Sequence, residues 1–346
     1  MKYGNFQDPV GLVGRMLKSG NPAAYSSLLR EFFSIMAGPI DRMLQGQERY
    51  ILQESNESSS LPIILIVGPP RGGTTLLYQV LASSLPVSYF NNFSALFPRS
   101  PISASRLFQK ILTNTHHSSN FNNYYGNTQR LSEPNDGFHI WNRWLGTNRY
   151  ESKRDLSSVA KGEMHHFFNT WLTIFNQPFL NKNNRNLYCM NILSKCLDNV
   201  YFIVVHRDPV FIAQSLFFAR QKIQGDQEVG WGLGSNQLSD YQGSDSALKS
   251  VAEQVAFIYS GLSEQRKAIE SARIIDVQYE EFCQNPNQII HHIYEKIWNI
   301  SNNNPSTSLP VIQSFDVSNR VRLSAQSFEK LQTFVDEYWH QMVKPI

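Results

Sequence analysis

Short apolar runs alternate along this chain with longer stretches in which apolar residues recur at helical spacing. The runs stand at residues 61–67, 200–205 and 273–277. Each is mostly apolar and ends at a glycine or a polar turn, which is typical of strands buried on both faces of a parallel sheet. Helical spacing follows at residues 76–81, 161–179, 187–197, 252–272, 286–298 and 325–342. The pattern predicts an α/β fold of three layers, with a central parallel sheet flanked by helices in one domain.

The N-terminal part of the chain has helical patterns of its own. Residues 9–18 and 25–47 carry apolar residues at three- and four-residue spacing, and we expect a break near Gly38 and Pro39. A polar linker at 53–60 separates these patterns from the first strand. The two helices would pack on the sheet or on a second subunit, so a homodimer stays open.

These patterns predict a helical extension over residues 1–52 and a main domain over residues 53–346. The first fifty residues contain neither an apolar run long enough to cross a bilayer nor the core of a signal peptide. We therefore expect no stable membrane insertion and a cytoplasmic protein.

Composition narrows the class of protein. Of 346 residues, 41% are hydrophobic and 17% are charged, which is typical of a globular protein, and the net charge of +3 gives no footprint for nucleic acid. The cysteines, Cys189, Cys196 and Cys283, lack metal-ligand spacing, so we expect buried thiols in a reducing compartment. His116 and His117 lack a third ligand at recognisable spacing, and we expect no metal site.

The first apolar run leads into the most informative segment, Gly-Pro-Pro-Arg-Gly-Gly-Thr-Thr at 68–75. A strand, a tight glycine turn and a helix start form an anion site, because free backbone N–H groups and the helix dipole converge there. Gly72 and Gly73 allow the backbone to approach an anion closely. Arg71 adds a forked, permanent positive charge.

This loop differs from that of ATP- and GTP-hydrolysing enzymes. Gly68 and Gly73 fit the spacing G-x-x-x-x-G, but the next two residues are Thr74 and Thr75, where such a loop needs Lys and then Ser or Thr. The lysine that would reach the terminal phosphates is replaced by an arginine earlier in the loop. This argues against an ordinary nucleoside triphosphatase.

A second candidate anion site follows the second run. Arg207 stands just past the end of that strand, where open α/β sheets place their ligands. Asp208 suits the N-cap of the next helix, Pro209 suits its first position, and Ser215 lies two turns into it. Two anion sites on one sheet edge imply a ligand with phosphate-type groups at two ends.

Four short segments of the chain resemble the sulfotransferases that use 3′-phosphoadenosine-5′-phosphosulfate (PAPS). Pro-Arg-Gly-Gly-Thr-Thr at 70–75 is similar to their P-R-S-G-T-T loop, with Gly for Ser. Arg-Asp-Pro at 207–209, with Ser215 eight residues after the arginine, matches their 3′-phosphate site. Tyr-Glu-Glu-Phe-Cys-Gln-Asn-Pro at 279–286 resembles their Y-E-D-L-x-x-x-P element, and Lys-Asn-Asn-Arg-Asn at 182–186 their lysine segment.

The resemblance implies a P-loop-type fold and in-line sulfuryl transfer from PAPS, with 3′-phosphoadenosine 5′-phosphate (PAP) as product and no metal. Sulfuryl transfer depends on positioning and on charge stabilisation, as phosphoryl transfer does. The implied groups that hold the transferring oxygens are the side chains of Arg71 and Lys182, and the groups that hold the 5′-phosphate belong to Gly72, Gly73, Thr74 and Thr75.

The acceptor would need a general base, which many members of the family supply as a His or Glu after the first helix. Our first choice is Glu133, with Asp136 and His139 as rivals. Asn92 and Trp141 complete the expected acceptor site, Asn92 because tyrosylprotein-type relatives carry their glutamate in this region.

The resemblance also implies how the nucleotide is held. Arg207 and Ser215 would bind its 3′-phosphate, and Tyr279 would lie near the adenine. Arg320 and Arg322 precede the final helix, where many relatives send a basic segment over the nucleotide.

A looser resemblance bears on the acceptor. Residues 126–144 are similar to a Y-G-x-T…E-P…W-x-R-W segment of bacterial sulfotransferases found near polysaccharide or specialised-metabolite genes. We therefore expect a hydroxyl of a carbohydrate or a specialised small molecule, while N-sulfation of an amine or guanidine stays open. A loop at 225–246 with Trp231 in its middle is either a lid or a plain surface loop.

Two other classes of function remain in view. A P-loop kinase would share the strand, loop and helix, but would need the missing lysine together with Mg²⁺ and ATP. A nucleotide-binding interaction protein would use the N-terminal helices as its working surface, and the retention of both anion sites together with Lys182 argues against it.

Overall fold

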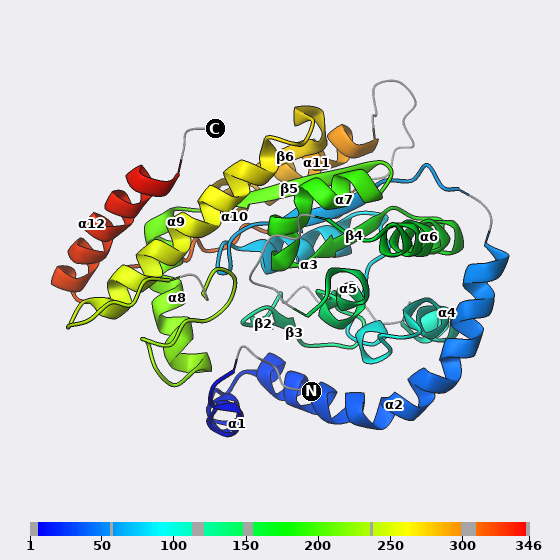
Figure 1. Cartoon of the computed structure of the whole chain (residues 1–346), viewed down its shortest axis with the longest axis horizontal. Helices are drawn as coiled ribbons and strands as arrows, with labels where there is room; N and C mark the ends of the chain where they lie inside the picture. The colour runs from blue at the N-terminus through cyan, green and yellow to red at the C-terminus, as the bar shows by residue number, and fades with distance from the viewer. Residues whose placement is uncertain are drawn as a thin grey trace.

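A computed structural model describes residues 6–55, 58–112, 121–147, 155–235, 238–298 and 309–343 (Figure 1). The strands are β1 (Ile63–Val67), β2 (Asn123–Tyr124), β3 (Asn127–Thr128), β4 (Phe179–Lys182), β5 (Val200–His206) and β6 (Ile274–Gln278). The α-helices are α1 (Pro9–Leu17), α2 (Pro22–Glu54), α3 (Thr74–Ser84), α4 (Pro101–Leu112), α5 (Phe138–Leu145), α6 (Ser158–Phe175), α7 (Met190–Cys196), α8 (Pro209–Ile223), α9 (Ser246–Arg266), α10 (Tyr279–Gln284), α11 (Pro286–Trp298) and α12 (Ala325–Met342). Short 3₁₀ turns are η1 (Ser94–Leu96), η2 (Asn184–Cys189) and η3 (Ser271–Arg273).

The main sheet is parallel and has the strand order β4-β1-β5-β6. In its register Ile66 of β1 lies between Lys182 of β4 and Ile203 of β5. All strands therefore end at one edge, and the segments that follow β1, β4 and β5 are brought together there. That edge is where ligands of open α/β sheets bind.

Alternate residues of each strand serve two separate cores. On one face Leu65, Phe202 and Ile274 pack with residues of α6 to α9 and α12. On the other face Ile64 and Ile203 pack with residues of α3, α10 and α11. Because both faces are covered, β1 and most of β5 are continuous apolar runs, and the predicted three-layer fold is confirmed.

Helix α2 runs along the outer edge of the molecule and curves around it (Figure 1). The break expected near Gly38 is wrong, because α2 continues through Pro39. Two buried carboxylates on its inner face hold it in place. Asp41 accepts from the Ser100 hydroxyl at 2.6 Å, and Glu48 accepts from the backbone N–H of Ser103 at 2.7 Å. These bonds fix α2 on the N-terminal turn of α4, so the proline bends the helix without ending it.

The three apolar runs of the sequence form strands β1, β5 and β6, as predicted. Strand β4 was not predicted, because its sequence Phe-Leu-Asn-Lys is half polar. The cysteines are buried and free, as expected. Within the ranges given above, no helix combines the length and apolar character needed to cross a membrane.

Candidate functional site

The loop between β1 and α3 presents unpaired helix amides. Gly73 is the N-cap of α3 and has a left-handed backbone with φ of 92°. A Cβ at this position would lie 2.2 Å from the ring of Tyr279, so a side chain is excluded by contact as well as by backbone conformation. With no side chain to accept from the first-turn N–H groups, the start of α3 is left open to an anion.

Arg71 lies in this loop in a left-handed conformation that is rare for a residue with a side chain, with φ of 70°. Its Nε donates to the Ser215 hydroxyl at 3.0 Å, and its guanidinium lies 4.8 Å from the ring centre of Tyr125. Burial lowers the pKa of Arg71, and the neighbouring charges of Arg207 and Arg322 lower it further. Three guanidinium groups therefore share one small region of positive potential.

Lys182 is the last residue of β4 and is only 6% exposed. Burial lowers its pKa, and so does the charge of Arg71, while the carboxylate of Asp136 opposes the shift. The ammonium of Lys182 lies near the first turn of α3. A Cβ placed on Gly126 would lie 3.7 Å from Lys182 Nζ and 3.8 Å from the hydroxyl of Thr75, so the two groups are close neighbours. The strand that the sequence pattern did not show thus delivers the predicted lysine to the start of α3.

Arg207 follows β5 and is held by two segments. Its Nη1 donates to the Arg71 carbonyl at 2.7 Å. Its Nη2 donates to the Ser318 carbonyl and the Asn319 side chain, each at 2.9 Å. The guanidinium also lies 4.5 Å from the ring centre of Tyr279. The two predicted anion sites are therefore joined directly, through the bond between the two arginines.

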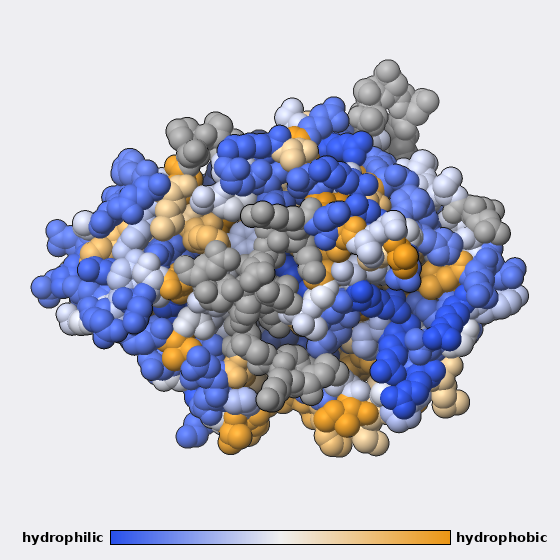
Figure 2. All heavy atoms as spheres, viewed as in Figure 1, coloured by the Kyte–Doolittle hydropathy of each residue, from blue (hydrophilic) through white to orange (hydrophobic). Residues whose placement is uncertain are grey.

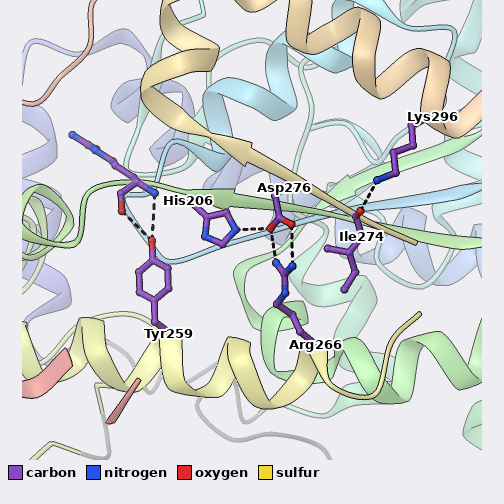
Figure 3. Close-up of polar contacts among 7 residues, drawn as sticks. His206, Tyr259, Arg266, Ile274, Asp276 and Lys296 are labelled. Carbon is purple, nitrogen blue, oxygen red and sulfur yellow. Dashed lines mark hydrogen bonds and ion pairs between the residues drawn. The ribbon is translucent and has the colours of Figure 1, made fainter. Parts of the chain in front are cut away.

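The backbone of Arg207 is fixed from α9. The hydroxyl of Tyr259 accepts from the Arg207 N–H at 3.3 Å and donates to its carbonyl at 3.1 Å (Figure 3). Beside it, Asp276 bonds to His206 at 2.6 Å and to both terminal nitrogens of Arg266 (Figure 3). Although burial opposes it, these two partners hold the pKa of Asp276 well below its usual range. The end of β5 is thus braced from α9 and β6.

The acidic candidates differ in position. Glu133 accepts from the backbone N–H of Gln129 at 2.7 Å, and its charge acts on Arg30 of α2. Asp136 acts on Lys182, and its carbonyl accepts from the side chain of Asn183 at 3.2 Å, next to that lysine. Both carboxylates act on Arg30, and Asp136 acts on Lys182 as well, whereas Glu133 closes a turn that faces α2.

Three other residues expected to meet the acceptor have different positions. Trp141 is fully buried, and its indole donates to Asn181 at 2.8 Å, so it belongs to the core and cannot face an acceptor. Asn92 is also buried and donates to Thr128 and to the Arg130 carbonyl, both at 2.7 Å, which braces the turn before α5. His139 lies half-buried in the first turn of α5, close in sequence to Asp136.

The segment 309–323, which we call the C-terminal strap, crosses the start of α8. Gln214 holds it by donating to the Arg320 carbonyl at 2.9 Å and by accepting from the Arg322 N–H at 2.7 Å. Both arginine side chains are exposed, and Arg322 is the one whose charge reaches Arg71. Tyr279 is buried below the strap, where its hydroxyl bonds to Ser318 at 2.9 Å.

Sequence reasoning missed Tyr125, Ser318 and Asn319. Tyr125 precedes a glycine and adopts a left-handed backbone with φ of 48°, which no pattern of residues shows. Ser318 and Asn319 directly precede the basic pair that was singled out, and that proximity was the available signal. Across the described residues there is no group of three His, Cys, Asp or Glu side chains that could hold a metal, and the pair His116–His117 lies outside them.

Comparison with known proteins gives results at three levels. A family model described as "Sulfotransferase family" matches residues 62–297. The sulfotransferase STF1 from Mycobacterium tuberculosis H37Rv is 14% identical, with 96% of this chain and 91% of that chain covered and a TM-score of 0.50. The sulfotransferase STF9 from Mycobacterium avium is also 14% identical, with 88% and 82% covered and a TM-score of 0.50. At this identity the two structures show a shared fold. No curated protein matches the sequence significantly.

Proposed function

The chain belongs to the sulfotransferase family, and we propose that it transfers a sulfuryl group from PAPS to a hydroxyl of a carbohydrate or a specialised small molecule. The family assignment rests on the match to residues 62–297, which include β1 and its loop, Lys182, and Arg207. The donor and the acceptor are our inference from the site.

One observation carries the choice of donor. Arg71, Lys182 and Arg207 gather at the edge of the sheet, and no ion pair to any of the three is found within the described ranges. Burying cationic groups without paired carboxylates costs free energy, and a polyanionic ligand would offset that cost. PAPS carries a phosphosulfate at one end and a 3′-phosphate at the other. The α3 side of the cluster suits the first group, and the Arg207 side suits the second.

The chemistry requires little covalent participation by the protein. The acceptor oxygen would attack sulfur, the bond from sulfur to the 5′-phosphate oxygen would break, and the acceptor proton would leave to a base. Charge then develops on the 5′-phosphate, where Lys182, Arg71 and the amides of Thr74 and Thr75 can stabilise it. Because Lys182 is buried and Arg71 is held by its bond to Ser215, their charge acts with little reorganisation.

We assign the base to Asp136, which our sequence analysis ranked below Glu133. Its support is that its charge acts on Lys182 and that its backbone carbonyl accepts from Asn183, the residue next to that lysine. The matched variants are Asp136→Asn and Glu133→Gln. We expect the first to lower kcat roughly 10²- to 10⁴-fold and the second to leave kcat within a small factor. The reverse result would return the assignment to Glu133.

The proposed acceptor side has aromatic residues that are half-buried. The ring of Trp231 stands edge-to-face with that of Tyr125 at 6.0 Å, and Tyr125 in turn covers Arg71. Phe138 follows Asp136 closely and lies 5.2 Å from the guanidinium of Arg185. Flat aromatic faces suit a sugar ring or a planar metabolite, which supports the proposed acceptor class.

Two measurements test the proposal. Calorimetric titration with PAP should show binding in EDTA, and labelled PAPS should give sulfated products with a panel of sugars and phenols. A protein that binds neither PAP nor PAPS would refute the proposed donor. Turnover that requires ATP and Mg²⁺ would indicate a kinase. Sulfation confined to amines would refute the hydroxyl acceptor and leave the proposed donor unchanged.

A further inference from the structure

The outward face of α2 carries an apolar surface that the proposed function does not use. Its residues are between 51% and 80% exposed, and we call them the α2 stripe: Leu29, Phe32, Phe33, Met36, Ile40 and Met43. Orange residues gather along the lower edge of the molecule in Figure 2, where Figure 1 places α1 and α2. Single exposed apolar residues are ordinary, but a contiguous patch on this scale marks an interaction site.

The stripe cannot turn inward. The opposite face of α2 holds Asp41 and Glu48, which bond to backbone N–H groups of Arg99, Ile102 and Ser103. Rotating α2 to bury the stripe would break these bonds and leave the N–H groups of Arg99, Ile102 and Ser103 without their acceptors, a change that is unfavourable. The described part of the chain therefore leaves the stripe uncovered.

We propose that the α2 stripe binds the same stripe of a second copy of this chain, with Met36 of the two copies together at a two-fold axis. Leu29, Met36 and Met43 recur every seven residues, and so do Phe33 and Ile40. This repeat keeps one seam of a helix facing another helix along its length. An isologous contact of this kind closes on itself at two copies.

The charges on α2 favour a second copy over a membrane. Its exposed charged residues are two acidic ones, Glu31 and Glu54, and two basic ones, Arg42 and Arg49. This helix therefore lacks the excess of lysine and arginine with which amphipathic helices bind anionic membranes.

The area available matches a dimer contact. An aromatic or large aliphatic side chain offers roughly 150–200 Å², so six of them at these exposures contribute roughly 600 Å² per copy. A stable interface buries roughly 800 Å² per partner. Tyr25 and Tyr50, which continue the seam and are 37% and 63% exposed, supply much of the remainder.

The first experiment measures mass by sedimentation equilibrium of the full chain. We expect twice the chain mass of 39.7 kDa. Met36→Glu places two like charges at the axis and should weaken the dimer roughly 100-fold or more. The matched control is Val159→Glu, because Val159 is a single valine of α6 that is 67% exposed. A monomeric wild-type chain, or a Met36→Glu variant that dimerises like the wild type, would overturn the proposal.

A second experiment tests the register. Met36→Cys should form a disulfide with its copy under mild oxidation, and Val159→Cys should not, since the native cysteines are buried and free. Binding of a monomeric chain to vesicles of phosphatidylcholine and phosphatidylglycerol, lost in Met36→Glu, would replace the second copy with a membrane. These readouts do not depend on sulfuryl transfer.

Discussion

The two strand-to-helix turns after β1 and β5 lie at the same edge of the sheet, and their helix N-caps differ in chemistry. After β1 the N-cap of α3 is Gly73, which has no side chain to bond to the helix amides. After β5 the N-cap of α8 is Asp208, whose carboxylate accepts from the N–H of Val210 at 2.8 Å. The amides are open to a ligand at the first turn. At the second turn they are already used, and the positive charge is that of the Arg207 side chain.

This difference predicts how each turn tolerates change. A site built from backbone amides is sensitive to any atom added at Gly73. A site built from one guanidinium depends on Arg207 itself and on the contacts that position it. We expect the first turn, with Lys182 beside it, to control the rate of transfer, and the second to control donor affinity.

The largest effect should come from Lys182→Met, which keeps the length of the side chain and removes its charge. Loss of a fixed charge that stabilises the departing oxygen costs roughly 10³-fold in rate. Single-turnover kinetics with saturating PAPS would measure it. Lys195→Met, at an exposed position of α7, is the control and should retain the wild-type rate. A rate within tenfold of wild type for Lys182→Met would remove the lysine from the mechanism.

The second effect should be one of affinity. Arg207→Ala should weaken binding of PAP about 10- to 100-fold, since a hydrogen bond to a charged group contributes roughly 1.5–3 kcal/mol. Titration with adenosine 5′-phosphate, which lacks the 3′-phosphate, provides the control, because its affinity should change little. Equal losses for both nucleotides would show that Arg207 acts by holding the Arg71 loop through its bond to that carbonyl.

The first turn could be predicted in detail because its signals are contiguous. The apolar run, the glycines and the following helix stand within residues 61–81, and local backbone chemistry connects them. The N-cap role of Asp208 was predicted for the same reason and is confirmed. In both places a short stretch of sequence determines its own conformation.

The remainder of the site depends on long-range packing. Strand β4 exists because Phe179–Lys182 pairs with β1, more than a hundred residues earlier, and its own four residues carry no strand pattern. Our preference for Asp136 over Glu133 as the base depends on the path of the loop between β3 and α5. The core position of Trp141 depends on Asn181, a polar residue that is fully buried. None of these outcomes is visible within a local window of sequence.

The cap itself should contribute to stability and not to binding. Asp208→Ala removes the bond to Val210 and should lower the free energy of unfolding by about 1 kcal/mol. Affinity for PAP should change less than twofold, because the α8 amides are not the ligand there. Chemical denaturation and titration of the same sample measure both. A loss of PAP affinity greater than that of Arg207→Ala would mean that the two turns bind anions in the same way.

The smallest effect concerns the brace beside the second turn, and it should depend on pH. Because the bonds from Arg266 and His206 hold the pKa of Asp276 below that of the unfolded chain, near 3.9, the stabilisation is complete above that value and is lost as pH falls below it. Asp276→Asn should therefore lower the free energy of unfolding by about 0.5–1 kcal/mol at neutral pH, the range for partly exposed ion pairs. The difference from wild type should shrink as the pH falls from about 5 towards 3. Asp336→Asn, at an exposed position of α12, controls for the loss of one negative charge. A deficit for Asp276→Asn that stayed constant across this range would mean that Asp276 supports the turn by shape and not by its charge.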